Sequence, residues 1–235
     1  MTEQVKPPTP SPNQVAAVSR RHVWVMLITA PLLWLSLWLV GRALWPQLSH
    51  EATDLETGQP LRLWVAVVAD IGLLLWVVWG LRKNGRGLAD IGLTTDWLGR
   101  EAIIGAVIGL GLWVGAQVPL WLLRLVGVDV SYRFLPVVGL PTHLLYVATV
   151  AVCEEIIWRG YAITELHRLY RLSASVVIAV MAFATFRLGE MALIDWLVLP
   201  LMLYVGGWLS VLYLWRRSLI APIVARAVLG GLGFV

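Results

Sequence analysis

Five ionisable residues occur inside long apolar stretches of the sequence, where charged side chains are expensive to bury. Glu154, Glu155 and Arg159 fall in one stretch, and Arg187 and Arg226 fall in two later ones. A carboxylate can act as a general base or accept hydrogen bonds, and a guanidinium can clamp a carboxylate or phosphate group. These five residues are therefore the candidate functional site.

The spacing of the two glutamates predicts different neighbours for each. In a helix, Glu155 and Arg159 stand four residues apart and share a face, whereas Glu154 points about 100° away. Counted at 1.5 Å per residue from the expected inner helix ends, Glu154, Arg187 and Arg226 lie roughly 12 to 21 Å deep. We expect all five charges to meet in one layer, with the glutamates as counter-charges of the arginines.

The elements that carry these residues must lie in a lipid bilayer. Of the 235 residues, 59% are hydrophobic and only 14% are charged, with a mean hydropathy of +0.79, which is outside the usage of soluble proteins. Backbone groups in lipid must be satisfied within their own segment, and this forces helices. We predict an all-α polytopic membrane protein with about seven transmembrane helices, near residues 23–45, 63–81, 101–125, 141–166, 173–188, 192–215 and 219–235.

The segments outside the apolar stretches predict domain organisation and orientation. Residues 1–19 form a Pro-rich, polar stretch that we expect to be a disordered tail, and residues 20–235 form the transmembrane domain. Between the expected spans, eleven basic residues fall on the side of the N-terminus and four on the other side. The positive-inside rule then places the N-terminus in the cytoplasm and the C-terminus outside, in a bacterial-type plasma membrane.

The charged residues also belong to three motifs that together resemble a known family. The run Glu154-Glu155-x-x-x-Arg159 resembles the first motif of the CPBP intramembrane metalloproteases, which include CAAX-processing and Abi-type peptidases. Phe183-Ala-Thr-Phe-Arg187 is similar to the second motif, Phe-x-x-x-His. Ser218-Leu-Ile-Ala-Pro-Ile, which precedes Arg226 and Gly230, is similar to the third, in which a His and, four residues later, an Asn follow. The resemblance covers residues 100–235 and implies a CPBP protease-like helical bundle.

The resemblance also implies catalytic roles, and the sequence departs from them. The first glutamate of the family acts as general base on a water, two histidines bind or position metal and water, and the asparagine supports the oxyanion. Here Glu154 stands at the base position with Glu155 and Arg159 as supports, but Arg187, Arg226 and Gly230 replace the other three. A guanidinium has no lone pair to give a metal. We therefore expect no metal and no cofactor, and zinc only if the chain is an active peptidase.

The remaining histidines and the single cysteine offer no alternative centre. His22, His50, His143 and His167 lack a second ligand at metal-binding spacing, so we expect them to be solvated or interfacial. Cys153 lies beside Glu154 in an apolar stretch with no histidine at a readable spacing, so a buried, inert thiol is expected rather than a nucleophile.

Three interpretations of the five charged residues are left open: an ion-pair network that holds helices in register, residual chemistry without metal, and a site for an anion or lipid headgroup. We expect a CPBP-family protein that has lost metal-dependent proteolysis and acts as a binding, scaffolding or accessory membrane subunit. The alternative is an active intramembrane metalloendopeptidase of CAAX-processing or bacteriocin-immunity type with Glu154 as general base.

The expected partners are the lipid bilayer and another membrane protein. Nucleic acid is excluded because no basic stripe lies outside the apolar stretches.

Overall fold

The structure is a computed structural model that describes residues 21–30, 32, 33, 36, 40, 59–95, 97–125, 140–190 and 198–233. Within these ranges every regular element is a helix, and residues 21–30 are helical too. The all-helical class predicted from the sequence is confirmed. The predicted tail at residues 1–19 and about half of the first expected span lie outside the described residues.

The helices follow the predicted apolar stretches closely. They are α2 (Gln59–Lys83), α3 (Leu98–Leu125), α4 (Leu140–Glu154), η2 (Glu155–Ile163), α5 (Thr164–His167), α6 (Leu172–Glu190), α7 (Val198–Arg216) and α8 (Ile220–Gly231), with a short 3₁₀ turn, η1 (Ala89–Ile91). Because α4, η2 and α5 run on without a break, they correspond to the single span expected near residues 141–166.

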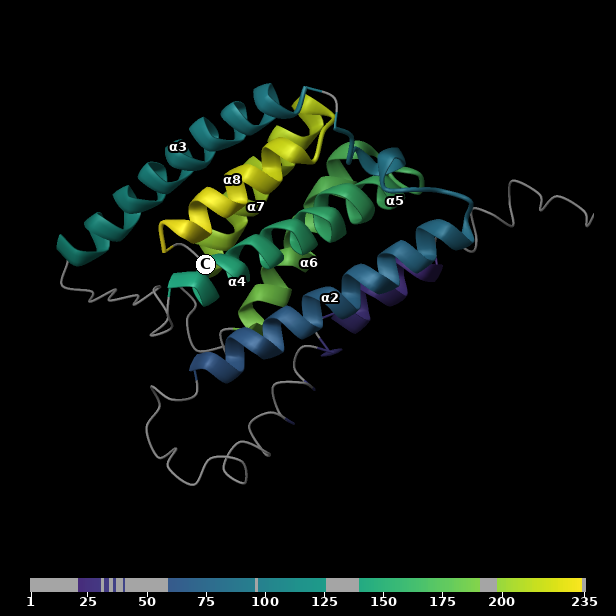
Figure 1. Ribbon diagram of the computed structural model, residues 1–235, viewed down its shortest axis with the longest axis horizontal. Coiled ribbons are helices and arrows are strands. Elements are labelled where there is room, and N and C mark those ends of the chain that lie inside the picture. Colours follow the sequence, from purple (N-terminus) through teal and green to yellow (C-terminus); the bar gives the residue numbers. More distant parts are fainter. Residues whose placement is uncertain are drawn as a thin grey trace, which may run out of the picture.

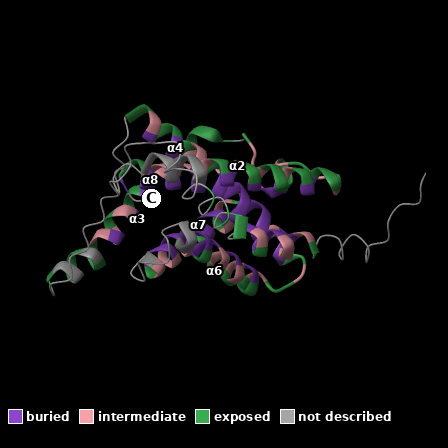
Figure 2. Cartoon of the chain, turned by 90° about the horizontal axis from the view of Figure 1, so that it is seen from below, coloured by how far each residue is buried: buried purple, intermediate pink, exposed green. Residues whose placement is uncertain are grey.

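The helices form two layers (Figure 1). Helix α3 packs along α8, α8 against α4, and α4 against α2, while α6 and α7 pack together behind this row. Seen from below, the buried residues gather between the row and the α6–α7 pair (Figure 2). Glu154 and Arg226 lie on neighbouring helices of the row, and Arg187 lies on α6 behind it.

Glycines let α3 and α8 approach closely. A Cβ atom added to Gly109 would lie 2.7 Å from the carbonyl oxygen of Ala225 and 2.9 Å from its Cα, and Gly105 lies similarly close to the Ala221 backbone. Small residues four apart are a common device for close helix contact in membranes. Since Arg226 directly follows Ala225, this contact fixes the helix that carries it.

The middle of the long helix is wound differently from the prediction. A continuous α-helix was expected near 141–166, but Glu155–Ile163 form a π-helix whose nine residues are all buried. Such wide turns are rare and are frequently found at functional sites. Gly160 fits here because a side chain at this position would lie about 3 Å from Leu219 and Ile91.

By length and composition, two of the described helical segments are able to cross a membrane, Leu98–Pro119 and Leu140–His167. Leu172–Arg187 and Ile220–Gly231 are shorter apolar helices. Helix α8, with twelve residues, rises about 18 Å, less than the hydrocarbon thickness of roughly 30 Å. It packs between α3 and α4.

Candidate functional site

The structure brings the five predicted charges together. Glu154 ends α4, Glu155 and Arg159 lie on η2, Arg187 lies on α6, and Arg226 lies on α8. None of these residues is more than 2% exposed. The continuous helix α4–η2 and the separate helices α6 and α8 therefore contribute charged side chains to one buried cluster, which we call the charged layer.

Glu154 is the centre of the charged layer. Nε of Arg187 lies 3.2 Å from its Oε1, and Nε of Arg226 donates a hydrogen bond to its Oε2 at 3.0 Å. A second nitrogen of Arg226, Nη2, also lies 3.0 Å from Oε2. Oε2 thus accepts a hydrogen bond from Arg226, and Oε1 lies within ion-pair distance of Arg187, so that the carboxylate links α4 to α6 and α8.

Glu155 has a separate partner, as the spacing predicted. Nη1 of Arg159 donates a hydrogen bond to Oε1 of Glu155 at 2.9 Å. Nη2 of Arg159 reaches the backbone carbonyl of Gly206 on α7 at 3.4 Å, and its guanidinium carbon lies 4.4 Å from the centre of the Phe183 ring. Arg159 thus joins η2 to α7 as well as neutralising Glu155.

Buried aromatic rings pack beside the charged layer, where Phe183 contacts Arg159. Trp158 on η2 packs edge-on against Phe183 at 6.2 Å and in a tilted arrangement against Phe186 at 5.6 Å. All three rings are at most 1% exposed. Burial of this kind lowers the local dielectric constant and strengthens the attraction between charges, but it also makes an unpaired charge very costly.

The charged layer does not fit a metal ion. Among the residues that the structure describes, no group of three or more His, Cys, Asp or Glu side chains could hold one. At the positions where the resembling family has imidazoles, the neighbours of Glu154 are Arg187 and Arg226, whose guanidiniums bind anions and not cations. Gly230, at the position of the family's asparagine, is buried in α8 and has no side chain to donate a hydrogen bond.

The histidines do not join the charged layer, but one of them differs from the prediction. His167 is exposed, as expected, and His50 lies outside the described residues. His143 was expected to be solvated or interfacial and is instead buried, with 5% exposure, because α4 packs between α2 and α8. His22 is half-buried against the rings of Trp76 and Trp79.

Two further buried residues, Cys153 and Asp70, lie within the helices. Cys153 is a buried free thiol, as predicted. Asp70 on α2 is only 2% exposed and is not among the five charges predicted to lie at membrane depth. Its position could have been recognised from the sequence, because Asp70 is an acidic residue inside the apolar stretch 63–81, as Glu154 is inside the stretch 141–166.

Additional ion pairs lie outside the charged layer, near one end of the bundle. Arg86, which follows α2, pairs with the buried Glu165 of α5. Arg216 at the end of α7 pairs with Glu101 of α3, where Nη2 lies 2.5 Å from Oε1. These pairs attach the chain around η1 and the start of α3 to the helices of the charged layer.

Comparison with known families agrees with this arrangement. Residues 136–231 match the model of a family described as type II CAAX prenyl endopeptidase Rce1-like. The matched segment contains all five residues of the charged layer, and its similarity to the Rce1-like CAAX proteases agrees with the motif resemblance. Proteins of this family are embedded in membranes, in agreement with the apolar helices described above. No curated protein and no solved structure matches the chain.

Proposed function

We propose that this CAAX protease-like membrane protein has lost metal-dependent proteolysis and acts as a binding or scaffolding subunit. One observation carries the proposal: Arg187 and Arg226 lie within ion-pair distance of the two carboxylate oxygens of Glu154, at 3.2 Å and 3.0 Å. A general base needs a water beside its carboxylate, and in this chain two guanidiniums lie beside that carboxylate. Here the residue at the base position serves as the counter-ion of two arginines.

Electrostatics favour the same conclusion. Three guanidiniums and two carboxylates give the charged layer a formal excess of one positive charge, all from residues at most 2% exposed. In the active family a divalent cation offsets the carboxylates, whereas in this chain arginines do so. The arginines would repel a metal cation at short range, because the medium around them has a low dielectric constant.

The ion pairs of the charged layer can serve a structural function that requires no catalysis. The network joins α4, α6, α7 and α8 through two ion pairs and a hydrogen bond to the Gly206 carbonyl. Buried ion pairs often add little net stability, but they can fix the register of the elements that they connect. We propose that a helical bundle held in this way presents a fixed surface to another membrane protein, with the N-terminus on the cytoplasmic side of a plasma membrane.

A peptidase assay tests the proposal. The purified protein, supplied with zinc in lipid vesicles, is incubated with a prenylated CAAX peptide beside a Glu154→Gln variant. We expect no cleavage above the variant's background. Turnover that disappears in Glu154→Gln would contradict the proposal and favour the active endopeptidase. A crosslinking experiment in native membranes then tests the subunit role, which predicts a reproducible stoichiometric partner.

A further inference from the structure

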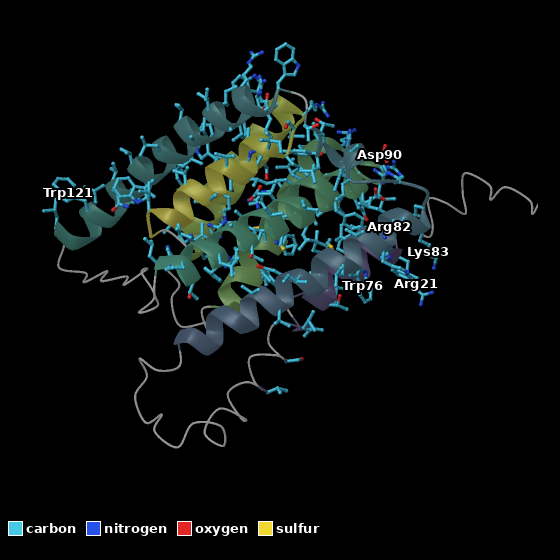
Figure 3. The ribbon with its side chains drawn as sticks, in the orientation of Figure 1. Arg21, Trp76, Arg82, Lys83, Asp90 and Trp121 are labelled. Carbon is cyan, nitrogen blue, oxygen red and sulfur yellow. The ribbon has the colours of Figure 1, made fainter. Side chains whose placement is uncertain are left out.

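A second group of polar side chains lies away from the charged layer, where the end of α2 meets residues 21 and 22. Trp76, Trp79 and Lys83 are spaced three and four residues apart and share one face of α2. Figure 3 shows Arg21, Arg82 and Lys83 at this end of the molecule, with Trp76 farther back along the same helix. The face is therefore basic at its tip and aromatic behind it.

His22 organises the aromatic part. Its ring lies 5.7 Å from both indoles, and the two indoles stand edge to face at 6.4 Å. The imidazole fits against the helix because Gly80 has no side chain, since a Cβ at Gly80 would lie 2.9 Å from His22 Cδ2. Despite this packing, Trp76 remains 39% and Trp79 55% exposed.

The basic part is available to an external anion. Arg21, Arg82 and Lys83 are exposed, and within the described residues none of the three forms an ion pair with a carboxylate. Nζ of Lys83 lies 5.0 Å from the centre of the Trp79 ring, which holds the ammonium beside the indole. In contrast, Arg86 and Arg216 nearby are already paired with glutamates.

We propose that this face, made by Arg21, Trp76, Trp79, Arg82 and Lys83, binds the headgroup of an anionic phospholipid. Exposed indoles prefer the level of the bilayer where headgroups meet acyl chains. Basic residues one turn nearer the helix end would then stand at the phosphate level, where each attracts anionic lipid. The basic residues would thus lie beside the phosphate of the phospholipid, and the indoles beside the start of its acyl chains.

Lipid titration of the detergent-purified protein tests this site, with binding followed by native mass spectrometry. Phosphatidylglycerol should bind in preference to phosphatidylcholine, and soluble glycerol phosphate should not compete, because it lacks the chains that contact the indoles. The triple variant Arg21→Gln, Arg82→Gln, Lys83→Gln should weaken phosphatidylglycerol binding by at least about tenfold. The Trp79→Leu variant, which keeps every charge, should weaken it by a smaller factor.

A matched variant separates a local site from the general positive charge of the inner end. Arg100→Gln, Arg168→Gln, Arg171→Gln removes the same charge from three other exposed positions. We expect it to bind phosphatidylglycerol as the unaltered protein does, and equal weakening in both triple variants would overturn the proposal. Competition by glycerol phosphate alone would also overturn it, because it would indicate a phosphate site without a lipid.

Discussion

Arg226 donates a hydrogen bond from Nε to Oε2 of Glu154 at 3.0 Å, although 72 positions separate the two residues in the sequence. The contact connects the end of α4 to α8. Arg187 approaches the other oxygen of the same carboxylate from α6. A single glutamate therefore satisfies charges from two distant helices, and the first prediction concerns what happens when it is removed.

Replacement of Glu154 by leucine should be more damaging than replacement of the whole group. Glu154→Leu leaves Arg187 and Arg226 buried beside each other without their carboxylate, a situation that typically costs roughly 3–5 kcal/mol. The triple variant Glu154→Leu, Arg187→Leu, Arg226→Leu should recover part of that loss, because no unmatched charge remains. Thermal unfolding in detergent measures both. Losses that simply add would show that the three residues do not stabilise one another.

Arg159 should not tolerate the change to lysine. A lysine keeps the charge but cannot reach Glu155 and the Gly206 carbonyl with two nitrogens of one planar group, nor stack on Phe183 in the same way. We expect Arg159→Lys to lower the free energy of unfolding by about 1–3 kcal/mol. The control is Arg168→Lys, whose side chain is 47% exposed and should change little. Equal effects at the two positions would contradict the assigned contacts.

The close approach of α3 and α8 predicts a sharp difference between two glycines of one helix. Gly109→Ala places a Cβ within 2.7 Å of the Ala225 carbonyl and should destabilise the bundle by about 1–3 kcal/mol. Gly111→Ala meets nothing within 4 Å and should be neutral or slightly stabilising, because alanine favours a helix. Thermal unfolding of the two variants distinguishes them, and a harmless Gly109→Ala would refute the contact.

Orientation can be measured with single cysteines, because Cys153 is the only one in the chain. In a Cys153→Ser background, Ser173→Cys lies at the start of α6, beside Arg168 and Arg171, and Leu140→Cys lies at the opposite end of the long helix. The basic bias predicts that position 173 faces the cytoplasm. A membrane-impermeant maleimide added to intact cells should label position 140 and not position 173, and the reverse pattern would invert the topology.

Much of this structure could be predicted from the sequence, and the exceptions have physical reasons. The helices coincide with the apolar stretches because lipid leaves the backbone no other way to satisfy its hydrogen bonds. The pairing of Glu155 with Arg159 follows from their separation of four residues. The choice between Arg187 and Arg226 for Glu154 could not be made, because depth along separate helices says nothing of which helices are neighbours. In the structure both arginines pair with it.

Two other features, the π-helix and the burial of His143, could not be predicted from the sequence because they depend on how the helices pack. The π-helix of Glu155–Ile163 depends on the packing around it and has no periodicity that distinguishes it from an α-helix. His143 became buried through the position of α4 between two neighbours, which its own segment does not encode. Asp70 and the Gly105 and Gly109 pair, by comparison, were readable: an acid in an apolar stretch, and small residues four apart.

The most direct test of the central claim, that arginines have taken the place of the metal, is the zinc content of the protein. The chain is purified in detergent without chelator, dialysed against micromolar zinc, washed, and analysed for metal beside a Glu154→Ala variant. We predict far less than one equivalent of zinc in both proteins, because Arg187 and Arg226 present cations to any ion that approaches Glu154. About one equivalent in the unaltered protein, lost in Glu154→Ala, would contradict the account.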